Sequence, residues 1–301
     1  MNSLKKLWSI DKIDVVVAIA GAALGIFISF LNIIYSNEYM ITIGPMLIIV
    51  CLAYLVFRKK LHDNVEEAEA GGRVIKIINI VFWLSFAVST YSLSTEVLHR
   101  PLIYFILISV CASAIALQIL FARGKGTTWL ILLEIFLVSL SVRASAYFVF
   151  PTLPGSDPWE HLRYIQDFVN TKSIASTHGD VYYLNYPVTH LNAAHMYLIT
   201  GAGYKTTMFF GIGLPLILST IFVFLIGKEV VNARVGLLAA LLVNLADTHV
   251  QFGVQLGATT YGVALFTLIV YMLIRNKYLM SMTAIAVMLL LLLIITHNMS
   301  S

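Results

Sequence analysis

Acidic and histidine side chains gather in one polar stretch, residues 151–202, between long apolar runs. It contains the sequence Asp157-Pro-Trp-Glu-His161. A carboxylate close to an imidazole can hold a divalent cation or accept a proton as a general base. Asp157 and His161 are therefore the candidate catalytic residues, and Asp157 is also a candidate metal ligand.

A purely structural role for Asp157 stays open beside this one. Asp-Pro-x-Glu is typical of a helix start, in which Asp157 caps, Pro158 takes the first helical position and Glu160 reaches back. The apolar residues that follow recur at helical spacing: Leu162, Ile165 and Val169. That pattern predicts a short amphipathic helix lying on the bilayer surface. The two roles are compatible, since one carboxylate oxygen can cap while the other faces a ligand.

A second helix of this stretch is predicted from Pro187 to the residue before Gly201, because glycine is the usual helix-stop residue. His190 and His195 lie on it. Five residues of separation place them about 140° apart around the helix, which is unsuited to a metal pair. For any single histidine of the stretch, ordinary surface placement is the alternative.

Ionisable residues also occur inside or at the ends of apolar runs. Glu134 and Arg143 lie in the run 127–150, and Asp247 and His249 close the run 235–253. Charges within a membrane are costly and point to function. Arg143 could reach an anionic head group or meet Asp157 or Asp247, and an internal ion pair is the alternative. Asp247 is the second candidate metal ligand.

The amino-acid composition indicates the class of protein to which these residues belong. Of 301 residues, 59% are hydrophobic and 11% are charged, against about 25% charged in soluble domains. This excludes a soluble globular enzyme, a disordered protein and a disulfide scaffold. Cys51 and Cys111 both fall in apolar runs, so neither a disulfide nor a cysteine metal site is expected. The net charge of +4 does not indicate nucleic acid, because the positive charges sit in short loops between apolar runs.

We therefore predict an all-α polytopic membrane protein. A spanning helix needs about 20 apolar residues, and nine segments qualify: Asp14–Ile34, Tyr39–Phe57, Ile77–Ser94, Pro101–Ala122, Thr127–Phe150, Gly203–Gly227, Val235–Gly253, Ala258–Ile274 and Leu279–Thr296. With the N-terminus inside, fourteen Lys and Arg residues fall on the inner side and four on the outer, with Arg143 inside a span. The first span is expected to stay as an anchor. The stretch 151–202 is then a long outer loop.

The outer loop and its flanks resemble a known superfamily. A span with Arg143 near its outer end is followed by Gly155-x-Asp157-Pro-Trp159-x-His161-x-Arg163, a helix starting Tyr186-Pro187, and a ninth span ending Thr-His297-Asn. The arrangement is similar to integral-membrane glycosyltransferases of the C fold, and most similar to archaeal and bacterial relatives of the oligosaccharyltransferase catalytic subunit. The resemblance covers roughly residues 127–301. Residues 1–126 form a predicted four-helix module to which it assigns no role.

The resemblance implies sugar transfer from a polyprenyl-phosphate donor to a protein or glycan acceptor at the outer face of a prokaryotic, for example archaeal, cell membrane. It implies substrate-binding roles for Arg143, Trp159, Arg163, Tyr186 and His297. It also implies a divalent cation, Mn²⁺ or Mg²⁺. Trp159 stands where the second acid of an Asp-x-Asp pair would be.

Two other classes stay open. A transporter or flippase for a lipid-linked or anionic substrate would show inverted repeats and helices broken inside the membrane, and Gly211, Gly213 and Pro215 predict a kink in the sixth span. A non-catalytic scaffold would present the outer loop to a partner. The family's members are longer, so we expect this sequence, which stops just past a span, to be a fragment, a split gene product or a truncated chain.

Overall fold

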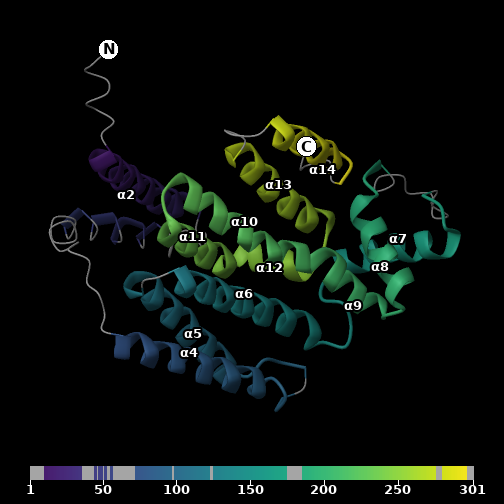
Figure 1. Cartoon of the computed structure of the whole chain (residues 1–301), viewed down its shortest axis with the longest axis horizontal. Helices are drawn as coiled ribbons and strands as arrows, with labels where there is room; N and C mark the ends of the chain where they lie inside the picture. Colours follow the sequence, from purple (N-terminus) through teal and green to yellow (C-terminus); the bar gives the residue numbers. More distant parts are fainter. Residues whose placement is uncertain are drawn as a thin grey trace. The chain divides into compact units, whose positions relative to one another are not determined.

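The computed structural model describes residues 10–35, 72–96, 98–122, 125–174, 185–275 and 280–296, with the short stretches 44–45, 47–49, 51–52 and 55–56. Every regular element in these ranges is helical, which confirms the predicted all-α class (Figure 1). The chain divides into two compact units, residues 1–68 and 69–301. The domain boundary predicted at residue 126 stays a prediction.

The first unit contains helix α2, Ile10–Tyr35. Its glycines allow a very close approach of a second segment. A Cβ atom at Gly25 would lie 2.8 Å from the carbonyl oxygen of Gly44, and one at Gly21 would lie 2.7 Å from Cys51 Sγ. Small residues at such contacts are typical of helix packing in membranes.

The second unit is a helix bundle with a smaller helix pair at one end (Figure 1). Its helices are α4 (Gly72–Ser92), α5 (Leu102–Phe121), α6 (Lys125–Phe148), α7 (Asp157–Thr171), α8 (Val188–Thr200), α9 (Tyr204–Met208), the π-helical turn η2 (Phe209–Gly213), α10 (Leu214–Val230), α11 (Ala233–Leu245), α12 (Asp247–Gln255), α13 (Ala258–Arg275) and α14 (Met280–Ile294). In the bundle, α5 packs against α4 and α6, α11 against α5, α6 and α10, and α13 against α10 and α14. Helices α7 and α8 pack against each other.

Five helices of the described part are long and apolar enough to cross a membrane: Gly72–Ser92, Leu102–Phe121, Gly126–Phe148, Tyr204–Val230 and Ala258–Arg275. A sixth span results if the bent pair α11 and α12 is counted as one. The apolar parts of α2 and α14, Val15–Leu31 and Thr283–Ile294, are shorter. Most of the predicted span Tyr39–Phe57 lies outside the described residues. The chain is thus a multi-pass membrane protein, and the count of nine stays a prediction.

Two spans depart from regular helix. The seventh predicted span, Val235–Gly253, was expected to be one helix, and this was wrong: α11 and α12 meet at an angle of 60°. Between them Ala246 is extended, with φ −64° and ψ 128°. In the sixth span, the π-helical turn η2 includes Gly211 and Gly213, two of the residues that predict a kink there.

Helices α10 and α11 form a hairpin whose backbones nearly touch. A Cβ atom at Gly236 would lie 2.4 Å from the Phe224 carbonyl oxygen and 2.9 Å from the Lys228 nitrogen. A Cβ atom at Gly227 would lie 2.6 Å from the Gly236 Cα. Because the crowded atoms belong to the backbone, neither helix can yield by a simple change of rotamer.

We predict that Gly236→Ala lowers the free energy of unfolding by about 1–3 kcal/mol, the usual cost of overpacking. Thermal unfolding of the purified protein in detergent measures the effect. Gly126→Ala is the matched control, since Gly126 is also helical and its Cβ would meet nothing within 4 Å. That substitution is expected to stabilise by up to about 1 kcal/mol. Equal effects at the two positions would contradict the tight packing.

Candidate functional site at the end of the helix bundle

Asp157 is the first residue of α7, and its side chain is exposed. It was expected to cap the helix, and the structure differs: helix α7 already includes Asp157, and Ser156, at the capping position, makes no side-chain cap bond. Within the described part of the chain, the Asp157 carboxylate accepts no hydrogen bond. The first turn of a helix favours a negative charge electrostatically. A free, ionisable carboxylate therefore sits at the start of the α7–α8 pair.

One turn further along α7, His161 is buried against His190 of α8. The His161 Nδ1 and His190 Nε2 atoms lie 2.9 Å apart. Tyr164 and Phe168 place their rings 5.3 Å and 6.3 Å from the His190 ring. A Cβ atom at Gly257, just before α13, would lie 3.1 Å from His161 Nε2. The pair joins helices α7 and α8 to each other and approaches the bundle at Gly257.

The protonation of this histidine pair governs a pH dependence. Burial, and next the neighbouring His161 imidazole, lower the pKa of His190 to about 3, against an opposing hydrogen bond with the Tyr186 backbone. In the unfolded chain the ordinary value is 6.5. Between these values the unfolded chain binds a proton that folded His190 does not. The stabilising contribution of neutral His190 is therefore complete above about pH 7 and is lost as the pH falls.

We predict that the free energy of unfolding falls by about 1.4 kcal/mol for each pH unit below about 6 on account of His190. Unfolding followed between pH 7.5 and pH 5 measures this, and His190→Gln should flatten the dependence. His195→Gln is the control, because His195 lies exposed on the same helix and should leave the slope unchanged. A slope that survives His190→Gln would contradict the assignment.

Arg143 of α6 is fully buried and bridges the break between α11 and α12. Its guanidinium donates to Ser139 Oγ at 2.7 Å and to the Asn244 carbonyl oxygen at 3.4 Å. It also donates to His249 Nδ1, 2.6 Å away. Because arginine can only donate, this nitrogen of His249 is an acceptor and the ring carries its proton on Nε2. Among the described residues, no carboxylate lies within 4.0 Å of Arg143.

The position of Arg143 depends on Gly253 of α12. A Cβ atom there would lie 2.6 Å from both Cδ and Nε of Arg143. The Asn244 side chain continues the network, accepting from Ser139 Oγ at 2.5 Å and bonding Thr220 Oγ1 of α10. A helix that ends inside the bundle leaves carbonyl groups without intrahelical partners. Arg143 donates to one of them, the Asn244 carbonyl, and also to His249 of α12, which makes it a residue that positions α12.

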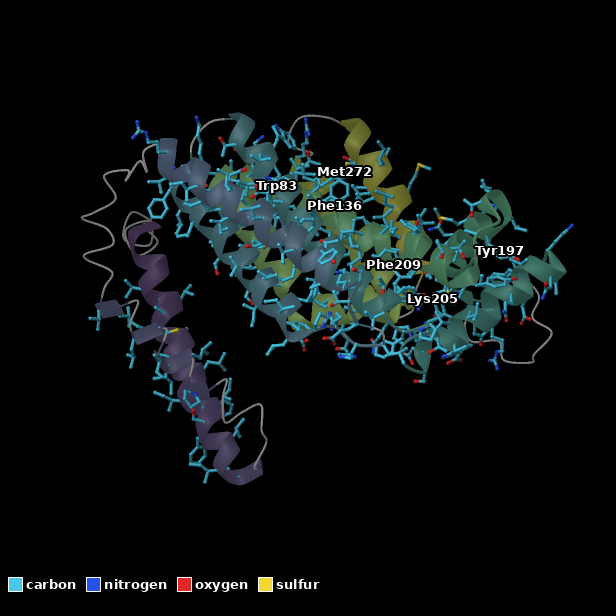
Figure 2. All side chains as sticks on the ribbon, turned by 90° about the horizontal axis from the view of Figure 1, so that it is seen from below. Trp83, Phe136, Tyr197, Lys205, Phe209 and Met272 are labelled. Atoms are coloured by element: carbon cyan, nitrogen blue, oxygen red, sulfur yellow. The ribbon has the colours of Figure 1, made fainter. Side chains whose placement is uncertain are left out.

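Lys205 of α9 holds the turn that leads from α6 to Asp157. Its Nζ donates to the carbonyl oxygens of Phe150 and Thr152, the latter at 2.9 Å. It also lies 5.1 Å from the centroid of the Tyr147 ring. Figure 2 shows Lys205 and Phe209 where the bundle meets the α7–α8 pair. Cationic charge is thus fixed beside the segment that carries Asp157.

An apolar groove of about 360 Å³ lies between α10 and α13. It is lined by Pro215, Leu218, Ile221, Phe222, Tyr261, Ala264, Leu265 and Leu268. Tyr261, at one end of the groove, also packs against the apolar cluster that includes Ile165 and Phe168 of α7. One end of the groove therefore lies next to the apolar cluster to which α7 contributes, and the groove runs along the bundle from there.

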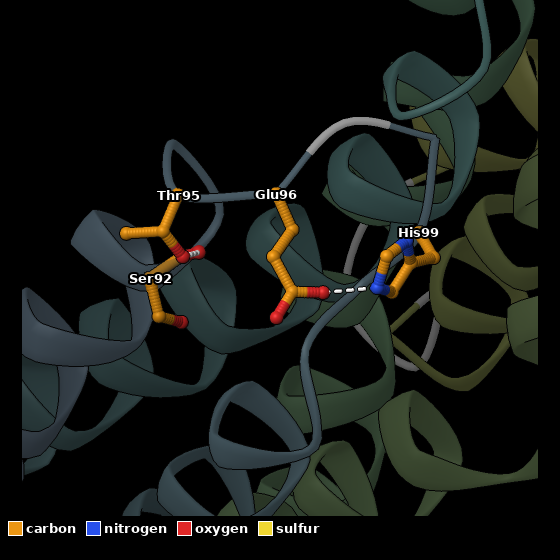
Figure 3. Close-up of polar contacts among 4 residues, drawn as sticks. All are labelled: Ser92, Thr95, Glu96 and His99. Atoms are coloured by element: carbon orange, nitrogen blue, oxygen red, sulfur yellow. Dashed lines mark hydrogen bonds and ion pairs between the residues drawn. The ribbon is translucent and has the colours of Figure 1, made fainter.

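A second hollow, of about 480 Å³, lies between the C-terminal part of α6 and the loop from α4 to α5. Its lining includes Ser145, Phe148 and Glu96. Glu96 forms an ion pair with His99, and Thr95 donates to the Ser92 carbonyl oxygen at 2.7 Å (Figure 3). Exposed ion pairs of this kind contribute little to stability. The carboxylate of Glu96 is already partnered, in contrast to that of Asp157.

The structure brings some predicted site residues together and leaves others apart. Trp159 and Arg163 lie with Asp157 on exposed positions of α7, and Tyr186 is half-buried just before α8. Asp247, the first residue of α12, is exposed and does not pair with Arg143. His297 lies outside the described residues.

Sequence reasoning missed the contact of His161 with His190 and the clamping role of Lys205. The one signal for the histidine pair was position: His161 stands four residues before buried Ile165, and His190 four before buried Ala194. That spacing places each histidine on the inward face of its helix. For Lys205 no signal existed, since its acceptors are backbone carbonyls of residues more than fifty positions away.

Across the described residues, no three side chains of His, Cys, Asp or Glu come close enough to form a metal-binding group. Carboxylates that bind Mg²⁺ or Mn²⁺ together with substrate phosphates do not need such a group. Comparison with protein families, curated proteins and solved structures finds no match to this chain.

Proposed function

We propose that the chain is an integral-membrane glycosyltransferase that uses a polyprenyl-phosphate-linked sugar at the outer face of a prokaryotic cell membrane. In the reaction, the bond between the sugar C1 and the phosphate oxygen breaks, and C1 bonds to an acceptor hydroxyl or amide. The acceptor's proton passes to the Asp157 carboxylate, and the phosphate leaves on its lipid. General-base assistance of this kind contributes about 10²–10⁴ in rate.

One observation carries the proposal: the Asp157 carboxylate is exposed and makes no hydrogen bond within the described residues, although it opens a helix. A residue that served the fold alone would be expected to use this side chain as a cap. Asp157 is instead free to meet a ligand. Trp159 and Arg163, also exposed on α7, offer an aromatic face and a charge for a sugar phosphate.

The apolar groove between α10 and α13 supports the choice of a lipid-linked donor. An amphiphile needs an apolar channel next to a polar site, and Tyr261 connects the groove to the cluster that seats α7. The Lys205 ammonium, held by the Thr152 carbonyl oxygen, places a positive charge at the end of the bundle where the groove meets this cluster. Mg²⁺ or Mn²⁺ held by Asp157 and the donor phosphate would supply charge neutralisation at the leaving group. Asp157 is the residue that would hold such an ion.

The groove yields a prediction of its own. Ala264→Phe would fill part of the groove, so we expect KM for a long-chain polyprenyl donor to rise about tenfold, the equivalent of 1.4 kcal/mol. For a donor with a short chain the change should be small. Phe266→Leu is the control, since Phe266 on the same helix is exposed and does not line the groove. Equal effects on long and short donors would contradict the groove's role.

The test of the function uses the full chain in sealed proteoliposomes supplied with a donor labelled in the sugar and with membrane extract as acceptor. We expect label to move into an acceptor fraction, and chelation of divalent cations to show whether metal is needed. Label that only crosses the vesicle membrane, still linked to lipid, would favour transport instead.

One observation favours that second function. The break between α11 and α12, with polar groups of Asn244 and His249 turned to Arg143, is of the type that transporters use at substrate sites. Flux of lipid-linked sugar that depends on Arg143, without any covalent transfer, would support it. A scaffold role predicts neither transfer nor flux.

A further inference from the structure

Glu134 of α6 is fully buried in the bundle, far along the helix from the candidate site. Its carboxyl meets two amide groups. Gln118 Nε2 of α5 donates to Glu134 Oε2 at 2.7 Å, and Asn79 Nδ2 of α4 lies 3.3 Å from Oε1. Helices α4, α5 and α6, which neighbour one another in Figure 1, thus each contribute a side chain to this contact.

Among the described residues, no cationic side chain forms an ion pair with this carboxyl group. No Lys, Arg or His nitrogen there lies within 4.0 Å of it. The surroundings are the apolar cluster of α4, α5 and α6, which includes Ile115, Ile131 and Ile135. An ionised carboxylate without a cation in such surroundings is strongly disfavoured relative to the neutral acid.

The other titratable and charged groups on the helices around α6 do not change this. The Cys111 thiol of α5 is the titratable neighbour and is buried; its Sγ lies 3.7 Å from the Phe82 carbonyl oxygen. On α5, Tyr104 bonds Ser141, and on α12, His249 bonds Arg143. The charged groups on the remaining helices are exposed: Arg73 and Lys76 on α4, Lys228 and Glu229 on α10, Arg234 on α11 and Asp247 on α12.

A second observation also indicates a proton at this carboxyl group. Gln118 is fully buried, and its Oε1 has no hydrogen-bond partner in the described part of the chain. A protonated carboxyl and a primary amide can form a ring of two hydrogen bonds, in which the amide N–H donates to one acid oxygen and the acid O–H donates to the amide oxygen. The first of these bonds is present. A proton on Glu134 supplies the donor that the amide oxygen lacks.

We propose that Glu134 is a proton-binding site inside the membrane domain: its Oε1 carries a proton that is shared with Gln118 Oε1, and the same Oε1 accepts from Asn79 Nδ2. The site is independent of the proposed glycosyl transfer. Its geometry joins α4, α5 and α6, the first three helices of the second unit.

Infrared spectroscopy of the full chain in lipid at pH 7 tests the site. The wild-type spectrum minus that of Glu134→Gln should contain the carbonyl band of a protonated carboxylic acid, shifted in D₂O. Asp157→Asn is the matched control and should leave this acid band in place. Loss of a carboxylate band in Glu134→Gln, or conversion of the acid band to carboxylate by sodium, would overturn the proposal in favour of an ionised or cation-binding group.

A second variant tests the sharing of the proton. Gln118→Met keeps a similar volume and removes the amide, so the acid band of wild-type Glu134 should move to higher frequency as its hydrogen bond is lost. An unmoved band would show that Gln118 does not share the proton. In ether-linked lipid, which has no ester carbonyl, the wild-type spectrum at pH 7 must itself contain the acid carbonyl band, and its absence would overturn the proposal even if a variant does not fold.

Discussion

Asp157→Asn should lower the rate of sugar transfer by about 10²–10⁴-fold, the usual contribution of a general base. Asparagine keeps the size of the side chain and cannot accept the acceptor's proton. Because Asp157 is exposed and makes no hydrogen bond in the described part of the chain, the fold should survive. Initial rates with saturating donor, measured beside a thermal unfolding scan, check both statements.

Glu160→Gln is the matched control for this loss. Glu160 also lies exposed in the first turn of α7, so its substitution removes the same charge one turn from the same helix end. Its transfer rate should stay within a few-fold of wild type. Equal losses in the two variants would assign the effect to local charge, and full activity of Asp157→Asn would remove Asp157 from the chemistry.

Arg143→Met should destabilise the second unit by about 3 kcal/mol or more. The substitution removes the donors that the Asn244 carbonyl, Ser139 Oγ and His249 Nδ1 receive, and each buried polar group left alone costs about 1–3 kcal/mol. The hydrogen bonds that Arg143 makes across the break between α11 and α12 are then lost. Arg143→Lys should recover a part of the loss, since a single ammonium cannot reproduce the planar fork of donors.

The unfolding of detergent-solubilised protein measures this effect, with Arg234→Met as control. Arg234 is exposed in the first turn of α11, and its loss should change stability by no more than about 0.5 kcal/mol. A small effect at both positions would contradict the clamp. Trypsin cleavage near Arg234, faster in Arg143→Met than in wild type, would locate the loosening at α11.

The long helices could be predicted from the sequence because burial in lipid demands long apolar runs. Helix α8 was predicted with its end, since Gly201 stops it with a positive φ of 65°. Each of these features depends on residues close in the chain. For these features, the local sequence pattern was sufficient to predict the structure.

The features that shape the candidate site depend on distant residues and could not be predicted in the same way. The helix breaks after Leu245, and position 246 is an alanine, neither proline nor glycine, so no residue there signals the break. The break depends instead on hydrogen bonds from Arg143, about a hundred positions earlier in the chain. The register of α7 places Asp157 inside the helix, so its carboxylate is left free. The contact of His161 with His190 exists only after α7 and α8 pack.

The most direct test of the account follows the bond that the proposed reaction breaks. Purified wild-type protein and Asp157→Asn are incubated with a polyprenyl-phosphate donor labelled in the sugar and with acceptor membranes, and the label remaining on lipid phosphate is measured over time. The account predicts that wild-type protein moves label from lipid to acceptor and that Asp157→Asn leaves it on lipid. Label that stays on lipid phosphate with folded wild-type protein, for every donor offered, would contradict it.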